Sequence, residues 1–160
     1  MSLLPRIAVL LLVVGLAPLA VAGNAAQALD RIFVDYEQEF LALNPHDATL
    51  RGDRRYNAVL ADRISDGFLA AERALTERYL AALDTIDTAA LGAAGQNSAA
   101  TFRFNLELAR ERHASGFAAK QALMPISQFS GLHLELEQLG SGSSVQPFAN
   151  AADHEAWLER

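Results

Sequence analysis

The first regular pattern of apolar positions lies between Ala28 and Asn44. Apolar residues recur there at spacings of four, four and three, which places them on one face of a helix. The residues of this stripe are Ile32, Tyr36, Phe40 and Leu43. Pro45 ends the pattern, because the residue before a proline avoids the helical region. The spacing therefore predicts an amphipathic helix over residues 28–44.

Two further stripes predict the longest helices of the chain. The first helix is predicted from about Asp62 to Ile86, with apolar positions Ile64, Phe68, Ala71, Leu75, Tyr79, Ala82 and Ile86. The second is predicted to end at about His113, with its stripe at Phe102, Leu106, Ala109 and His113. Asn97 or Ser98 is the expected N-cap of this second helix, since short polar side chains accept hydrogen bonds from free helical N–H groups.

The remaining segments carry weaker patterns. They read as a polar connection with a bend (45–60), a short helix (118–124), a mixed segment (125–139), a flexible Gly/Ser run (140–144) and a helix capped by Asp153 (150–160). No run alternates apolar and polar residues in the manner of a strand, and no internal repeat is present. The sequence thus predicts an all-α fold, an irregular helical array with long loops.

The amino-terminal pattern is that of a secretory signal peptide. One basic residue, Arg6, precedes an apolar run from Ile7 to Ala17, and Pro18 is expected to break any helix there. The small-x-small sequence Ala20-Val21-Ala22 follows, which predicts cleavage between Ala22 and Gly23. Cleavage after Ala28 is a second option.

A retained membrane anchor is the alternative to cleavage. A spanning helix needs about 20 apolar residues, whereas the run before Pro18 has 11. We therefore expect residues 1–22 to be removed and residues 23–160 to be exported to the periplasm or the medium. We therefore expect this chain to contact the membrane only through its export signal.

Composition narrows the classes of partner and chemistry. Removing residues 1–22 leaves 138 residues with 12 basic and 19 acidic side chains, a formal charge of −7. This acidity argues against nucleic acid, which requires clustered Lys and Arg. The absence of cysteine excludes a disulfide framework and thiol chemistry, and it fits a bacterial envelope setting. The composition leaves the oligomeric state open.

The motifs of the common hydrolytic sites are missing from this sequence. No two of its four histidines are three or four residues apart, and the position that would complete a His-Glu-x-x-His motif after His154 is Leu158. The sequence also lacks a Gly-x-Ser-x-Gly elbow and a phosphate-binding loop. We therefore assign no catalytic residue, metal ligand or cofactor to this chain. His113 is expected to be a core or helix-end histidine.

Three arginines lie close together in the polar connection, at Arg51, Arg54 and Arg55. Guanidinium groups bind carboxylates in a bidentate manner, so this cluster is a candidate contact for an anionic peptide or sugar acid. The alternative is local ion pairing with nearby acidic residues, namely Asp47, Asp53 and Asp62.

Three stretches, in this order and spacing, resemble the bacterial domain of unknown function 885 family. They are FLALNPHDATLRGDRRYN (40–57), MPISQFSGLH (124–133) and QPFANAADHEAWLER (146–160). The resemblance extends over roughly residues 28–160.

The resemblance implies an exported or lipid-anchored helical protein several times this length, similar to zinc metallopeptidases. The family's metal motif, far towards the C-terminus, has no matching positions here, so zinc would belong to the full-length protein. Gln128 and His133 are the candidates for positions that face the substrate cleft. The alternative for Gln128 is that it satisfies buried backbone groups.

Three hypotheses about function follow. The first is the N-terminal part of an exported, peptidase-like hydrolase of peptides, which itself lacks the zinc motif. The second is a stand-alone periplasmic helical binding module, and the third is a non-functional gene fragment. The helical pattern runs to Arg160 without a terminating signal, so we expect residues 23–160 to be part of a larger domain.

Overall fold

A computed structural model describes residues 17–124, 126–127 and 131–160, with side chains described from residue 23 on. Its helices are α2 (Ala17–Leu43), α3 (Pro45–Leu50), α4 (Asp66–Asp84), α5 (Ala93–Ala114), α6 (Phe117–Ala122), α7 (Leu132–Gly140) and α8 (Ala151–Glu159). Short 3-10 turns, η1 (Arg54–Tyr56) and η2 (Thr88–Ala90), join them. Within these residues the sole β-type feature is an isolated bridge, so the predicted all-α class is confirmed. No described helix is long and apolar enough to cross a membrane.

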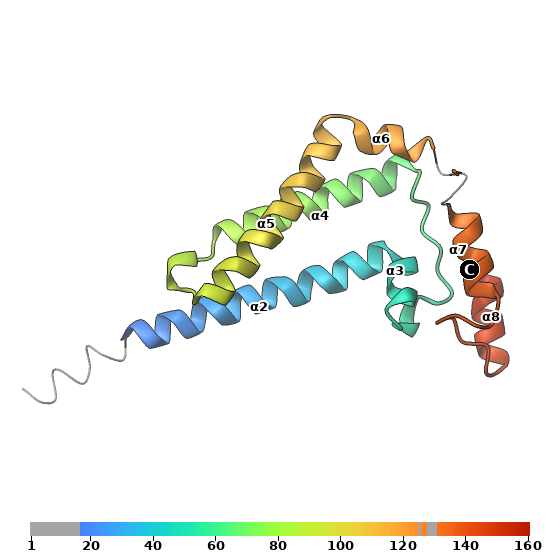
Figure 1. The fold of residues 1–160 in the computed structure, drawn as a ribbon, viewed down its shortest axis with the longest axis horizontal. Coiled ribbons are helices and arrows are strands. Elements are labelled where there is room, and N and C mark those ends of the chain that lie inside the picture. Colours follow the sequence, from blue (N-terminus) through green and yellow to red (C-terminus); the bar gives the residue numbers. More distant parts are fainter. Residues whose placement is uncertain (1–16, 125, 128–130) are drawn as a thin grey trace, which may run out of the picture.

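The hydrophobic core lies where α2, α4 and α5 pack together (Figure 1). Its buried members are Leu29, Leu75, Tyr79, Leu80, Leu83, Leu91, Ala99 and Leu106. Three aromatic rings add edge-to-face contacts: Tyr36 lies 5.2 Å from Tyr79 and 4.8 Å from Phe102 between ring centroids. The apolar stripes predicted for these three helices therefore meet one another in the folded chain.

The helix α2 begins earlier than predicted. It starts at Ala17 and runs through Gly23 without interruption. Pro18 does not break it, because a proline in the first turn of a helix removes an N–H that has no intrahelical partner. Residues 7–16, where a preceding helix would lie, are outside the described residues, so the expected break at Pro18 and cleavage between Ala22 and Gly23 both stay predictions.

Two other predicted helix starts also differ from the structure. The helix α4 begins after Ser65, whose hydroxyl accepts a hydrogen bond from the N–H of Phe68 at 3.2 Å. The helix α5 begins after Gly92, so Asn97 and Ser98 lie inside it and do not cap it. Its first turn closes against Leu91, where a Cβ on Gly95 would lie 3.3 Å from the Leu91 Cβ. Gly95, which precedes the helix start predicted from the sequence, thus lies within α5 and allows close packing against Leu91.

The polar connection contains a buried helix. Four residues of α3 are buried, namely Pro45, His46, Ala48 and Thr49. Gly52, with φ of 82°, then reverses the chain, and the Thr49 hydroxyl donates to the Asn57 side chain at 3.2 Å. The predicted bend is therefore present, but this segment is more buried than its polar sequence indicates.

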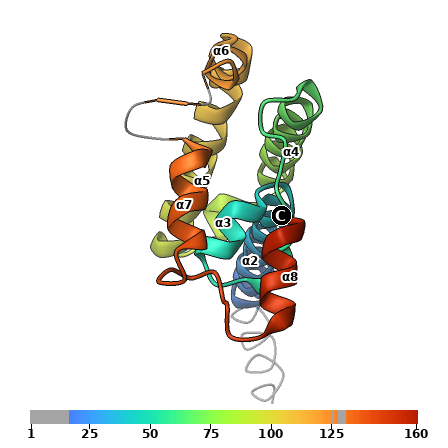
Figure 2. The same cartoon turned by 90° about the vertical axis from the view of Figure 1, so that its right-hand side faces the viewer.

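The helices α7 and α8 lie at one end of the molecule, next to α3 (Figure 2). The mixed segment thus includes a helix, α7, which the sequence pattern did not resolve. The helix α8 is capped by Asn150, which accepts a hydrogen bond from the N–H of Asp153 at 3.1 Å. Asp153 in turn accepts from the N–H of Ala149 at 3.0 Å. The predicted cap residue therefore takes part in the N-terminal turn from inside the helix.

Candidate functional site

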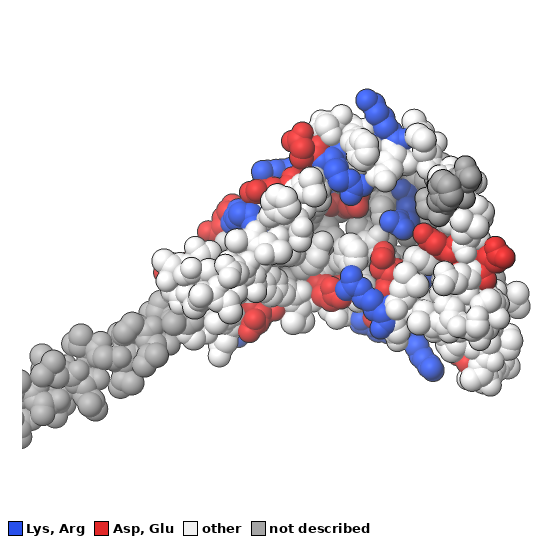
Figure 3. All heavy atoms as spheres, in the orientation of Figure 1, with Lys and Arg blue, Asp and Glu red and all other residues white. Residues whose placement is uncertain are grey.

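An open pocket of about 610 Å³ lies between the segment 60–64, the first turns of α4, the end of α5, α6 and the start of α7. The face seen in Figure 3 is hollowed between the α4–α6 part and the α2–α3 part, and side chains of both charges lie around the hollow. A volume of this size is in the range of small-ligand sites, about 300–1,000 Å³.

Apolar side chains form much of the pocket wall. They are Leu60, Ile64, Phe68, Leu69, Met124 and Leu132. Two of them are strongly exposed, with Ile64 at 57% and Met124 at 76% of their full accessible surface. Exposed apolar surface is unfavourable in water by roughly 25 cal/mol per Å². A contiguous patch of this kind indicates a binding surface.

One carboxylate of the pocket is held by a nearly buried histidine. Glu72, on α4, lies in the pocket wall, and its Oε2 is 3.1 Å from Nε2 of His113 at the end of α5. The His113 side chain is 6% exposed and that of Glu72 is 30% exposed. The nearly buried imidazole therefore holds the carboxylate in place, while the carboxylate stays accessible from the pocket. His113 lies inside the helical body, as its position on the apolar stripe predicts.

A second carboxylate is held in the same way from another direction. Glu135, on α7, also lines the pocket, and its Oε2 is 3.2 Å from Nε2 of His46 on α3. The His46 side chain is 9% exposed and that of Glu135 is 41% exposed. This pair was not predicted from the sequence, because its two residues are far apart in the chain and no local spacing connects them.

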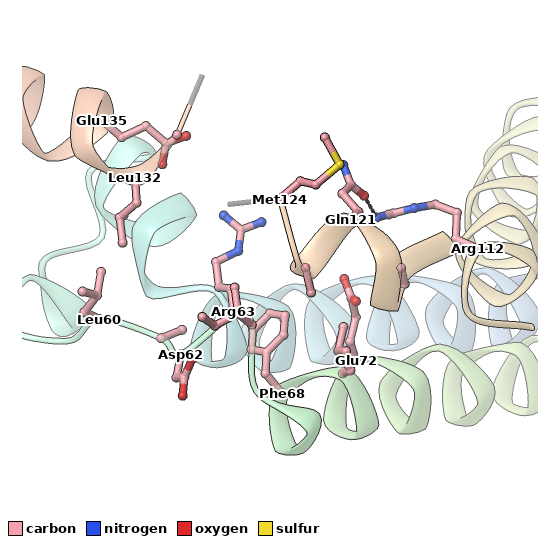
Figure 4. A pocket seen from close by; sticks show the side chains of 16 residues that line it. Leu60, Asp62, Arg63, Phe68, Glu72, Arg112, Gln121, Met124, Leu132 and Glu135 are labelled. Atoms are coloured by element: carbon pink, nitrogen blue, oxygen red, sulfur yellow. Dashed lines mark hydrogen bonds between the residues drawn. The ribbon is translucent and has the colours of Figure 1, made fainter. Parts of the chain in front are cut away.

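Two arginines bring positive charge to the pocket. Arg112 donates a hydrogen bond to the side-chain oxygen of Gln121 at 2.8 Å. Arg63 points into the pocket between its two carboxylate-bearing walls (Figure 4). Within the part of the chain that the structure describes, the Arg63 side chain has no hydrogen bond or ion pair. It is therefore a free cation inside a pocket that also offers accessible carboxylates.

The residues present do not fit a zinc site. Among the described residues, no group of three His, Asp or Glu side chains is placed to hold a metal ion. His46 and His113 each meet a single carboxylate, whereas catalytic zinc takes three protein ligands. We therefore derive no catalytic step through a metal on these residues.

The predicted arginine cluster lies away from the pocket and is largely paired within the chain. Arg51 forms an ion pair with Glu37 on α2. Arg55 donates to Asp53 at 2.6 Å, and this hydrogen bond lowers the pKa of the Asp53 carboxyl below its ordinary value. Arg54 is exposed and has no ion pair with a described residue. Pairing with a nearby acid thus describes Arg55, whereas Arg51 pairs with another helix, and an external anion contact at Arg51, Arg54 and Arg55 stays a prediction.

Of the two candidate cleft positions, His133 does not line the observed pocket. Gln128 lies outside the described residues. His133 is exposed on α7, and its neighbours Leu132 and Glu135 line the pocket in its place. On a helix, residues two positions apart point to different faces, so His133 and Glu135 are directed differently. A cleft-facing role for Gln128 and His133 stays a prediction.

A buried polar network attaches α8 to α3. Arg160 donates to the Thr49 hydroxyl at 3.0 Å, to the Gln146 side chain at 3.2 Å and to the Pro45 carbonyl at 3.4 Å. Burial lowers the pKa of the Arg160 guanidinium from its ordinary value. Within the described residues, Nε of Arg160 and Nε2 of Gln146 find no hydrogen-bond partner. This network joins α3 to the residue that follows α8, across 111 positions of sequence between Thr49 and Arg160.

The fold and the site together define an all-α protein with an open, amphipathic pocket in which acidic and basic groups lie among apolar walls. The family described as "Bacterial protein of unknown function (DUF885)" matches residues 45–160, and the chain belongs to this family. The match confirms the resemblance of the three stretches and includes every element around the pocket. No curated protein and no solved structure matches the chain.

Proposed function

We propose that this chain is the N-terminal helical segment of an exported, peptidase-like hydrolase, in which it forms a wall of the substrate channel. The observation that carries the proposal is the open pocket of about 610 Å³, with exposed apolar side chains and accessible charges. Among the described residues no group is placed to hold a metal ion, so we propose that this segment supplies no metal ligands. In the intact enzyme they would come from the C-terminal motif that the family resemblance implies.

Export is the second part of the proposal. The charged start, the apolar run and the small-residue exit support removal of residues 1–22 and a location in the periplasm or outside the cell. Mass spectrometry of the exported protein should find Gly23 as its first residue. An exported protein that retains Met1 would contradict this part of the proposal.

The reading frame after codon 160 tests the hydrolase assignment directly. We expect it to continue into a zinc-binding motif, and we expect the longer product to cleave peptides until a chelator removes the metal. The chain of residues 1–160 should cleave none. A stop codon after Arg160, or chelator-sensitive cleavage by residues 1–160 alone, would overturn the assignment, and a stop codon would favour a stand-alone binding module or gene fragment.

A variant in the pocket wall tests the role of this segment in the longer product. Phe68→Ser removes an apolar contact surface from the pocket, so we expect KM for peptides to rise several-fold. Phe104→Ser is the control, since Phe104 is 65% exposed on α5 and does not line the pocket. Equal effects of the two substitutions would show that the pocket is not part of the substrate channel.

A further inference from the structure

The pocket combines three features that single out a class of ligand. Its walls are apolar, at Phe68 and Leu69 among others, and its carboxylates Glu72 and Glu135 stay partly open to solvent. Arg63 supplies a cation without a protein partner in the described part of the chain. An ion inside a partly apolar site is stabilised by an opposite charge. A ligand that satisfies all three features carries an ammonium, a carboxylate and apolar side chains.

We infer that the pocket binds a short apolar peptide by its free ends, with the α-ammonium at Glu72 and the α-carboxylate at Arg63. Figure 4 shows that the Arg63 side chain reaches the pocket from the segment before α4, while Glu72 lies further along α4. The two charged groups thus lie at different places in the pocket, which suits the separated ends of a peptide.

The position of Glu72 on α4 explains its assignment to the ammonium. Glu72 is four residues after Phe68, and residues four apart on a helix lie on the same face. An ammonium at Glu72 therefore places the adjoining side chain of the peptide over Phe68. The buried imidazole of His113 holds the Glu72 carboxylate in place at 3.1 Å, so its geometry is set before the ligand arrives.

Binding of tri-leucine to the full chain, measured by titration calorimetry, tests this inference. Free tri-leucine should bind, and both N-acetyl-tri-leucine and tri-leucine amide should bind about tenfold more weakly, since each has lost one charged end. Equal affinities for the free and blocked peptides, or no detectable binding of the free peptide, would overturn it.

Two variants test which residue binds the α-ammonium of the peptide and which binds its α-carboxylate. Glu72→Gln should bind the free and the N-acetylated peptide equally, and Arg63→Gln should bind the free peptide and the amide equally. Glu77→Gln and Arg54→Gln make the same charge changes at exposed positions outside the pocket and should leave both ratios unchanged. If Glu135→Gln, rather than Glu72→Gln, abolishes discrimination against the N-acetyl group, the assignment of the ammonium is wrong.

The inference rests on the proposed function only in treating the bound peptide as a substrate. It concerns binding by this chain alone, whereas the proposed function concerns cleavage by a longer product. Discrimination of the peptide ends without a downstream zinc motif would therefore support the site and reject the hydrolase. If the longer product cleaved peptides but the pocket did not discriminate between free and blocked peptide ends, the hydrolase would be supported and the site would be rejected. Arg63 is an exposed loop residue, so Arg63→Gln is expected to fold even if Glu72→Gln does not.

Discussion

At the scale of single residues, the notable arrangement is a carboxylate held by a buried imidazole, which occurs at two places around the pocket. His113 was identifiable as an interior residue because it continues the apolar stripe of its helix. Its partner Glu72 was not, because the pairing depends on how α4 and α5 are rotated against each other. The burial and the partner of His46 were not predicted, since it follows Pro45 in a segment whose composition is polar and Glu135 is far away in the chain.

Tyr79 offers a residue-scale prediction with a pH dependence. Tyr79 is a buried residue whose hydroxyl donates to Oε1 of Glu39 at 2.8 Å, and burial, followed by this hydrogen bond, raises the pKa of Tyr79 from its ordinary value of 10.0. Tyr79→Phe should lower the free energy of unfolding by about 1–2 kcal/mol at neutral pH. Chemical denaturation of both proteins measures this difference.

The sign of the pH dependence follows from the raised pKa. The stabilisation by the neutral hydroxyl is fully present below pH 10.0, the ordinary pKa, and is lost as the pH rises through the higher pKa of the folded state. The difference between wild type and Tyr79→Phe should therefore shrink in strong alkali. Tyr56→Phe serves as the control, and a Tyr79→Phe effect that grew with pH would contradict the assignment.

At the scale of elements, helix ends and helix contacts decide the shape of the C-terminal part. Asn150 and Asp153 fix the start of α8 by reciprocal side-chain contacts with the backbone. The last residue of α7, Gly140, then lies directly against Trp157 of α8. A run of sequence that reads as a flexible linker thus begins with a residue that is needed for close packing.

Gly140→Ala tests this packing. A Cβ at Gly140 would lie 2.8 Å from Cζ2 of Trp157, which forces the ring or the helix to move. Alanine favours a helix by roughly 1 kcal/mol over glycine, but overpacking costs about 1–3 kcal/mol. We expect net destabilisation of about 1 kcal/mol and a changed fluorescence spectrum of Trp157, the single tryptophan of the chain.

Gly67→Ala is the matched control for this substitution. Gly67 lies in the first turn of α4, and a Cβ at this position would have the Ser65 Oγ as its nearest neighbour, at 3.9 Å. This change should therefore stabilise the protein by about 0.5–1 kcal/mol. A Gly140→Ala protein that is equally stabilised, with unchanged fluorescence, would show that α7 and α8 do not meet at this point.

At the scale of the whole molecule, the chain has a well-packed body and a more loosely attached end. The helices α2, α4 and α5 share the apolar core. In contrast, α7 contributes a single buried apolar residue, Leu139, and α7 and α8 are otherwise attached to α3 through polar side chains, in the pair His46–Glu135 and the contacts of Arg160. Because single polar contacts contribute little net stability each, the two parts should differ in local stability. The pocket lies at their junction.

Native-state hydrogen exchange should show this difference. We expect the amides of α4 and α5 to exchange slowest and those of α7 and α8 to exchange several orders of magnitude faster. Arg160→Gln removes the contact with Thr49 and should accelerate exchange in α3 and α8 while leaving α5 unchanged. The control is Arg103→Gln, which removes an exposed ion pair with Asp84. If Arg160→Gln accelerated amide exchange equally in all helices, this would contradict the view that α7 and α8 are attached separately from the core.

Periodicity and local motifs alone determined the all-α class, the three core helices and membership of the family. These are local properties, because a helix satisfies its own backbone hydrogen bonds and its apolar stripe identifies the face it buries. Tertiary structure decided the start of α5, the burial of α3 and the partners of His46, His113 and Arg160. It also formed the pocket, since Glu135 on α7 is brought to the same pocket as Glu72 on α4 and Arg63 in the preceding segment by packing, which no spacing along a single helix encodes.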